Sequence, residues 1–125
     1  MSGRLVLVIE DNEMNQRFVR EVLRLSGYRV EVRADAEAGI AAARALAPDV
    51  VLMDVQLPGR DGLDAARELR LDPATAHLPI VAVTALAMPG DRQRALDAGC
   101  TSYLAKPIDY RELLALLDDL LPEAT

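Results

Sequence analysis

The chain alternates five times between a short apolar segment and a longer stretch with helix signals, and this alternation limits the folds open to it. Short continuous apolar runs are typical of strands that are covered on both faces. Alternating strands and helices imply right-handed crossovers, and hence a parallel sheet with helices on both sides. The sequence therefore predicts a single doubly wound α/β domain. The expected strands are LVLVI (5–9), YRVEV (28–32), VVLM (50–53), PIVAV (79–83) and SYLA (102–105).

Start and stop signals bound the five expected helices. Asp35 can cap the second helix, which Pro48 stops, and Asp72-Pro73 ends the third. Asp109 and Glu112 form a capping box for the fifth. The other expectations are that Met14, Phe18, Val22 and Leu25 share one face of a first helix ended by Gly27, that Pro89 opens the fourth helix, and that Gly99 closes it.

Length and composition narrow the class of protein. We expect residues 1–125 to form one domain without an output domain, since 125 residues is near the commonest domain size and no linker is visible. No apolar run reaches the roughly 20 residues that cross a bilayer, and the first residues lack a signal peptide's layout. The lone Cys100 gives no sign of an oxidising compartment, so a cytoplasmic setting is expected. A net charge of −6 with scattered basic residues argues against direct nucleic-acid binding.

Polar residues follow four of the five expected strands. Glu10 and Asp11 come after the first strand, and Asp54 after the third. Thr84 follows the fourth, and Lys106, the only lysine beside thirteen arginines, follows the fifth. In open parallel sheets, ligands bind beyond the carboxyl ends of the strands, where the strand order reverses. We therefore expect these five side chains to share one rim.

The chemistry of this rim indicates phosphoryl transfer. Three neighbouring carboxylates repel one another unless a cation neutralises them, and oxygen ligands suit Mg²⁺, with Mn²⁺ as an alternative. A metal beside Asp54 would let a phosphoryl group approach its carboxylate. Thr84 and Lys106 could then hold phosphoryl oxygens. Each residue alone has an ordinary interpretation as a cap, strand end or solvated charge, but their joint placement at four strand ends makes those interpretations improbable.

Other residues that could carry chemistry have simpler explanations. We expect Asn12 to cap the first helix, and Cys100 to lie at the edge of the core rather than act as a reactive thiol. His77 is expected on a loop surface. Met14 and Met53 are expected to pack in the core, whereas Phe18 is either core or an outward-facing contact for a partner.

Four segments carry a family resemblance: VIEDN (8–12), LMDVQLPGRDG (52–62), VAVTALA (81–87) and YLAKPI (103–108). Their order and spacing resemble the receiver domains of two-component response regulators over essentially the whole chain. The segment from His77 to Asp109 particularly resembles stand-alone receivers of the DivK type and the receiver modules of hybrid histidine kinases. The resemblance implies a flavodoxin-like, CheY-like fold with strand order 2-1-3-4-5.

The resemblance also implies roles for the rim residues. Asp54 would accept a phosphoryl group from a phosphohistidine, and Thr84 and Lys106 would hold its oxygens. Asp11, Asp54 and the backbone carbonyl of Gln56 would bind Mg²⁺, with Glu10 acting through water. The remaining roles implied are an accessible backbone N–H at Ala85, a switch aromatic at Tyr103 and a cis Lys106-Pro107 peptide bond.

The function expected from these observations is a phosphorylation-switched signalling module, not an enzyme acting on a metabolite. Its partners would be a histidine kinase or histidine phosphotransferase, and a downstream protein bound by the fourth helix, fifth strand and fifth helix. A module cut from a hybrid kinase is the first alternative. A flavodoxin-like electron carrier is disfavoured because the acidic loop EDNEMN would repel a flavin phosphate. A haloacid-dehalogenase-type phosphatase is disfavoured because Asp11 lacks a second Asp two residues later.

Overall fold

The computed structural model describes residues 3–85 and 89–121, and its centre is one parallel sheet. The sheet runs in the order β2-β1-β3-β6-β7. Counted by these five strands alone, the order is 2-1-3-4-5, so the predicted doubly wound α/β fold is confirmed. The strands are β1 (Leu5–Ile9), β2 (Arg29–Arg33), β3 (Val50–Asp54), β6 (Ile80–Thr84) and β7 (Ser102–Ala105).

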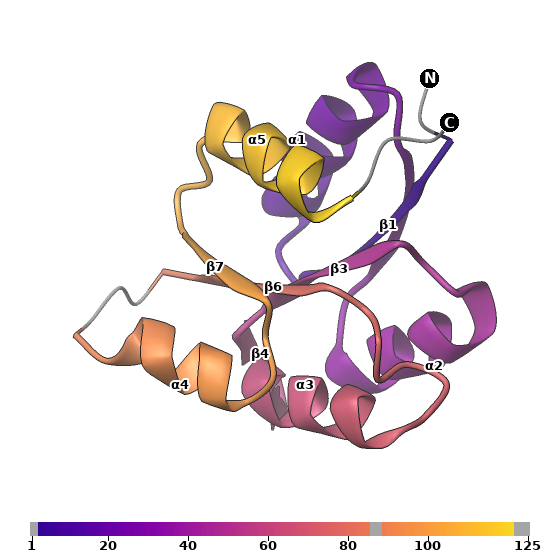
Figure 1. Ribbon diagram of the computed structural model, residues 1–125. Coiled ribbons are helices and arrows are strands. Elements are labelled where there is room, and N and C mark those ends of the chain that lie inside the picture. The colour runs from indigo at the N-terminus through magenta and orange to yellow at the C-terminus, as the bar shows by residue number, and fades with distance from the viewer. Residues whose placement is uncertain (1–2, 86–88, 122–125) are drawn as a thin grey trace.

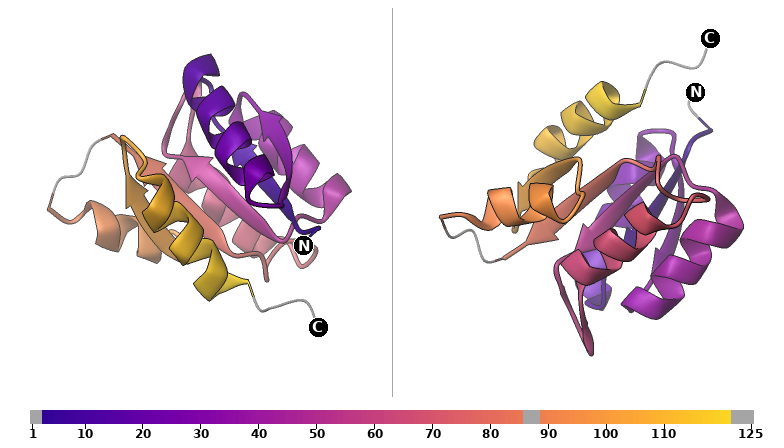
Figure 2. Two further views of the ribbon diagram at one scale, coloured as in Figure 1. Left: turned by 90° about the horizontal axis from the view of Figure 1, so that it is seen from above. Right: turned by 60° about the horizontal axis from the view of Figure 1, so that its bottom comes forward.

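Five helices cover the two faces of the sheet. Helices α1 and α5 lie on one face, and α2, α3 and α4 lie on the other (Figure 1). The view from above in Figure 2 shows α1 and α5 crossing the same face of the sheet. No helix within the described residues is long and apolar enough to cross a membrane. The helices are α1 (Glu13–Leu25), α2 (Ala36–Leu46), α3 (Gly62–Leu71), α4 (Asp91–Asp97) and α5 (Tyr110–Leu120).

Strand residues alternate between two apolar layers because successive side chains point to opposite faces. On β1, Val6 and Val8 pack with α1 and α5, whereas Leu7 and Ile9 pack with α2, α3 and α4. All five residues of β1, β3 and β6 are buried, as expected for strands covered on both sides. The sheet is thus a rigid base for residues at its carboxyl edge.

Side-chain caps start the helices where the sequence indicated. Asn12, Asp35 and Asp109 each accept a hydrogen bond from a backbone N–H in the first turn of the following helix. Asp61, which was not predicted as a cap, accepts from the N–H of Leu63 at the start of α3. These caps fix where each loop at the rim of the sheet ends.

The buried side of α1 differs from the expected face. Val19 and Leu23 are buried, whereas Met14 and Leu25 are each 79% exposed and Phe18 is 47% exposed. The expectation that Met14 packs in the core is therefore wrong, and Phe18 faces outward. Met53 is fully buried, as predicted. The four predicted residues do recur at helical spacing, but that spacing cannot say which side of the helix meets the sheet.

Two local features of the chain after β3 and β6 also differ from expectation. Helix α4 begins at Asp91 after Gly90, which has φ +91°, so Pro89 lies in the preceding turn and does not open the helix. A short antiparallel hairpin of β4 (Gln56–Leu57) and β5 (Arg60–Asp61) was not predicted. The end of the VAVTALA segment, residues 86–87, lies outside the described residues.

Candidate functional site

The rim residues predicted from the sequence come together at the carboxyl ends of β1, β3, β6 and β7. The strand order reverses between β1 and β3, which is where ligands bind in open α/β sheets. Asp54 is the last residue of β3 and Thr84 the last of β6, and each is only 3% exposed. Glu10 follows β1 and is 5% exposed. Two carboxylates are therefore buried at the switch point, and a hydroxyl is buried at the end of the neighbouring strand.

Three acidic residues at this point could hold a metal ion. One carboxylate oxygen from each of Glu10, Asp11 and Asp54 lies within 4.8 Å of the others, and Asp11 is exposed to solvent. Hard carboxylate oxygens with one open side suit Mg²⁺, which takes a few protein ligands and keeps several waters. The donor set thus fits the predicted metal. Gln56, whose backbone carbonyl is the fourth predicted ligand, lies exposed two residues after Asp54.

Lys106 forms an ion pair with both buried carboxylates and offsets one of their two negative charges. Its Nζ atom lies 2.9 Å from Glu10 Oε1 and 3.0 Å from Asp54 Oδ2. Desolvation by burial lowers the pKa of Lys106, but hydrogen bonds and charges from Glu10 and Asp54 outweigh it, so the pKa is raised overall. Lys106 is therefore a stable cation between the two acids. The sequence indicated a phosphate contact for this residue but not its bond to Glu10.

Backbone and amide groups complete the surroundings of the two acids. Asp54 Oδ1 accepts the backbone N–H of Gln56 at 2.9 Å. Glu10 Oε2 accepts the N–H of Asn12 at 3.1 Å, and the side chain of Gln16 donates to the backbone carbonyl of Glu10. Within the described residues, no buried side-chain polar atom lacks a hydrogen-bond partner. The carboxylates are held in fixed positions, which a phosphoryl acceptor requires.

Close backbone packing shapes the loop after Asp54. A Cβ atom on Gly62 would lie 2.2 Å from the carbonyl oxygen of Asp54, so only glycine allows this approach. Gly62 also donates its N–H to the carbonyl of Val55 at 2.9 Å. The β4–β5 hairpin thus folds back directly against the end of β3.

The predicted switch residues line one side of the site. Thr84 and the half-buried Tyr103 border a cavity of about 260 Å³ that also reaches Gln56 and Ala95. Ala85 is exposed, and its backbone N–H lies 3.4 Å from Gln56 Oε1. Sequence reasoning missed this amide contact, because nothing local relates two residues that are 29 positions apart. The Lys106-Pro107 peptide bond is cis.

The other residues considered from the sequence lie away from this chemistry. Cys100 is 5% exposed, and burial raises the pKa of its thiol to about 11. It is a small core residue, as predicted. His77 lies exposed in the turn before β6, also as predicted. Asn15, on the first turns of α1, points its amide toward Glu10 at 3.5 Å.

Comparison with known proteins agrees with this geometry. The family model for the response regulator receiver domain matches residues 6–118. The polar-differentiation response regulator DivK of Brucella ovis is 38% identical over 120 residues, which cover 95% of this chain and 97% of that protein. The DivK proteins of Brucella suis and Brucella abortus match equally well.

Solved structures give the same result. A putative response regulator from Chloroflexus aurantiacus superposes with a TM-score of 0.90 at 30% identity, covering 95% of this chain and 98% of its own. The receiver domain of a sensor histidine kinase from Pseudomonas aeruginosa superposes with a TM-score of 0.88 at 40% identity, with the same coverage. That structure holds a magnesium ion in its active-site cleft. The rim at the strand ends, the fold and the match over residues 6–118 lead to one conclusion: this chain belongs to the response regulator receiver domain family.

Proposed function

We propose that this chain is a phosphoacceptor in two-component signalling, with Asp54 as the residue that receives the phosphoryl group. The observation that carries the proposal is the position of its carboxylate. It is buried at the switch point of the sheet, beside Glu10 and Asp11 and 3.0 Å from the ammonium of Lys106. A carboxylate held this way is oriented for nucleophilic attack and faces groups that can receive a new anion.

The reaction moves one phosphoryl group from a histidine to Asp54. A carboxylate oxygen of Asp54 forms a bond to phosphorus while the bond from phosphorus to the donor histidine nitrogen breaks, and that nitrogen keeps the electron pair. Glu10, Asp11 and Asp54 would hold Mg²⁺, which supplies charge neutralisation between the acceptor and the incoming phosphoryl group. Lys106 and Thr84 would hold phosphoryl oxygens. The chain would be a signalling domain and not an enzyme acting on a metabolite.

The signal would pass to other proteins through the side of the domain that carries Tyr103. Phosphorylation would convert the singly charged Asp54 carboxylate into an acyl phosphate with about two negative charges, a gain of about one charge and several acceptor oxygens at the site. Thr84 and Tyr103 border the same cavity, so movement of Thr84 toward the phosphoryl group leaves room for Tyr103 to turn inward. Helix α4, strand β7 and helix α5 would then present a changed surface to a downstream protein. The donor would be a histidine kinase or a histidine phosphotransferase.

The alternative of a module from a hybrid kinase has specific support, because the Pseudomonas aeruginosa neighbour is the receiver domain of a sensor histidine kinase. Both alternatives use the same chemistry at Asp54. They differ in the length of the native reading frame, which sequencing across both ends of the coding region would measure.

Labelling with a small phosphodonor tests the acceptor. In the presence of Mg²⁺, the protein should gain one phosphoryl group that base or hydroxylamine removes, as expected for an acyl phosphate. Asp54→Asn should abolish the label, whereas Asp64→Asn, on the exposed side of α3, should keep it. Equal labelling of Asp54→Asn and the wild type would refute the proposal.

A further inference from the structure

We propose that Arg60 is a positioning residue that holds the β4–β5 hairpin in place and thereby keeps Gln56 against Asp54. The consequence of this contact for metal binding and phosphorylation rests on the function proposed above. The proposal concerns the loop that immediately follows the phosphoacceptor, which has little structure of its own.

The hairpin is too small to hold itself in place. It has two strands of two residues each, joined through Pro58 and Gly59, and only Leu57 is buried. Short isolated hairpins are marginally stable in water. Its inner end is tied to the sheet by the bond from the Val55 N–H to the Val83 carbonyl, at 2.9 Å. Its outer end is held by the Asp61 cap on α3 and by the bond from the Gly62 N–H to the Val55 carbonyl, and a side-chain attachment at Arg60 adds to these two local bonds.

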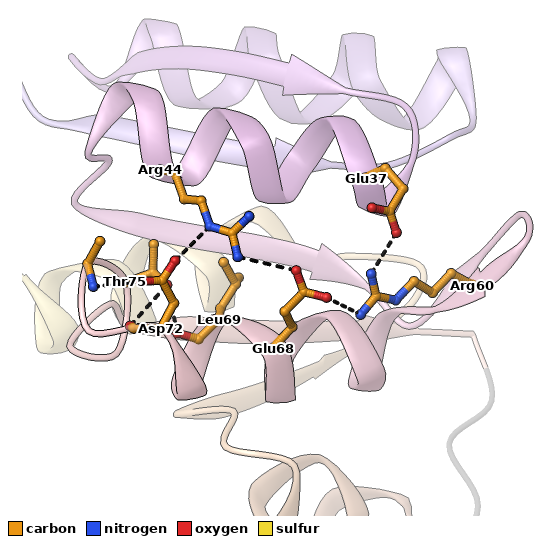
Figure 3. Close-up of polar contacts among 8 residues, drawn as sticks. Glu37, Arg44, Arg60, Glu68, Leu69, Asp72 and Thr75 are labelled. Atoms are coloured by element: carbon orange, nitrogen blue, oxygen red, sulfur yellow. Dashed lines mark hydrogen bonds and ion pairs between the residues drawn. The ribbon is translucent and has the colours of Figure 1, made fainter.

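Arg60 supplies that attachment by bridging two helices. Its Nη1 atom lies 2.6 Å from Glu37 Oε1 on α2, and its Nη2 atom lies 2.6 Å from Glu68 Oε1 on α3. Figure 3 shows the guanidinium between the two carboxylates, with its two outer nitrogens directed at different helices. A planar guanidinium presents its nitrogens in a fixed fork, so that two of them can reach carboxylates in different directions, whereas a lysine offers a single point charge. The side chain is 27% exposed, so it is partly shielded from water.

The bridge continues into a longer row of charges along the seam between α2 and α3. Glu68 Oε2 lies 3.3 Å from Arg44 Nη2, and Arg44 Nε lies 2.7 Å from Asp72 Oδ2 (Figure 3). The hydrogen bond from Arg60 lowers the pKa of Glu68, and the bond to Glu68 raises the pKa of Arg60. Networks of alternating charges hold side chains better than isolated surface pairs. Glu68 is thus fixed from two sides when it meets Arg60.

The position of the hairpin matters because Gln56 contacts both sides of the site. Its backbone N–H donates to Asp54 Oδ1 at 2.9 Å, and its side-chain Oε1 lies 3.4 Å from the Ala85 N–H. Gln56 pairs with Asp61, next to Arg60, in the hairpin. Motion of the outer strand therefore reaches Gln56 directly. Groups that orient metal ligands from outside typically affect metal affinity by about 10- to 100-fold when removed.

A positioning role for Arg60 and a simple charge effect predict opposite changes in Mg²⁺ affinity when Arg60 is replaced. Removing a positive charge near an acidic cluster strengthens the binding of a cation through the field alone. Loosening the hairpin weakens Mg²⁺ binding, because part of the binding free energy must then be used to order the loop. Arg60→Gln should therefore raise the Mg²⁺ concentration for half-saturation about tenfold, the lower end of that range. Arg67→Gln removes the same charge from an exposed ion pair with Asp64 on α3, and should leave the Mg²⁺ concentration for half-saturation unchanged or lower.

Two measurements on the full chain test this difference. Isothermal titration with Mg²⁺ gives the half-saturation for the wild type, Arg60→Gln and Arg67→Gln. Labelling by a small phosphodonor at rising Mg²⁺ should reach the same maximum in all three, within about twofold, because saturating metal restores the loop. Arg60→Gln binding Mg²⁺ as tightly as Arg67→Gln would overturn the proposal.

Amide hydrogen exchange without metal gives an independent readout. The N–H groups of Gln56 and Gly62 should exchange faster in Arg60→Gln than in the wild type, whereas Val55, bonded to the sheet, should be unchanged. Glu37→Gln removes one of the two ion pairs of Arg60, at a partner that is 75% exposed, and should speed the same exchange by a smaller amount. This variant provides the test if Arg60→Gln folds poorly. Failure of the wild type to bind Mg²⁺ would count against the proposed function only. Unchanged exchange in both variants would refute the role of Arg60.

Discussion

Replacing Lys106 by methionine should destabilise the metal-free protein, because it removes the cation between two buried carboxylates. The ammonium lies 2.9 Å from Glu10 Oε1 and 3.0 Å from Asp54 Oδ2. At these distances each attraction is about 5 kcal/mol for an effective dielectric constant of about 20. We do not expect the variant to lose the full energy of both attractions, because one of the two carboxyls can take up a proton instead.

Proton uptake limits the cost and fixes its dependence on pH. Protonating a carboxyl with an ordinary pKa of about 4 costs about 1.4 kcal/mol for each pH unit above it, or about 4 kcal/mol at pH 7. We therefore expect Lys106→Met to lower the free energy of unfolding by about 3–4 kcal/mol at pH 7 and by about 1 kcal/mol at pH 5. The folded variant binds one proton more than its unfolded chain, so its stability rises as the pH falls.

Lys106 itself does not titrate in this range. Its pKa is raised from 10.5, so its contribution to wild-type stability is complete below that value and is lost only as the pH rises through the higher folded pKa. The difference between variant and wild type between pH 5 and 8 thus reports the two carboxyls. Urea unfolding at several pH values measures it, with Arg92→Met on the exposed surface of α4 as the control.

Magnesium supplies the second half of this test. In the wild type, the ammonium and the metal compete for the same carboxylates, whereas in Lys106→Met the metal displaces only a proton. A ligand at a hundredfold excess over its dissociation constant raises the free energy of unfolding by about 2.7 kcal/mol, and tighter binding at the same ligand concentration raises it further. Mg²⁺ should therefore raise the melting temperature of the variant more than that of the wild type. A variant as stable as Arg92→Met at pH 7, or one that gains less from Mg²⁺, would refute the reasoning.

Two further predictions concern α1 and the core. Asn15 borders a groove with Phe18 and Pro107 beside the site, so Asn15→Arg should slow phosphoryl transfer from a protein donor but not from a small phosphodonor. Equal slowing by both donors would indicate damage to the site itself. Cys100 has a thiol pKa of about 11 and is buried, so a disulfide reagent at pH 8 should modify it about 100-fold more slowly in the native protein than in urea. Comparable rates would contradict its assignment to the core.

The fold and the rim of the site could be predicted because both follow from rules of backbone connection. Five alternations of strand and helix leave few topologies, and parallel strands bring their carboxyl ends to one edge. The residue after each strand can then be located at this edge without knowledge of its side-chain conformation. Glu10, Asp54, Thr84 and Lys106 were found in this way, although the direct pairing of Lys106 with two acids was not.

The exposed face of α1 could not be predicted from spacing, because this helix carries apolar residues on two sides. Met14, Phe18 and Leu25 recur as regularly as Val19 and Leu23, and both sets satisfy a helical period. The choice is made by the entry of the chain from β1 and by contact with α5, which depend on residues about 90 positions away. The exposed apolar side chains of Met14 and Phe18 beside the site are typical of a surface that binds a partner protein. The Asn15→Arg variant tests whether a protein phosphodonor binds there.

The attachment of the β4–β5 hairpin lay beyond sequence reasoning for a different reason. Arg60 meets acids 23 positions before it and 8 positions after it, and thirteen arginines face twenty acidic residues in this chain. Long charged side chains reach many partners at similar free energy, so pattern alone does not select one pair. Selection comes from the helices α2 and α3, which hold Glu37 and Glu68 on either side of the Arg60 guanidinium (Figure 3). Backbone rules therefore place the proposed phosphoacceptor, while the order of the loop beside it depends on a contact that this particular set of charges creates.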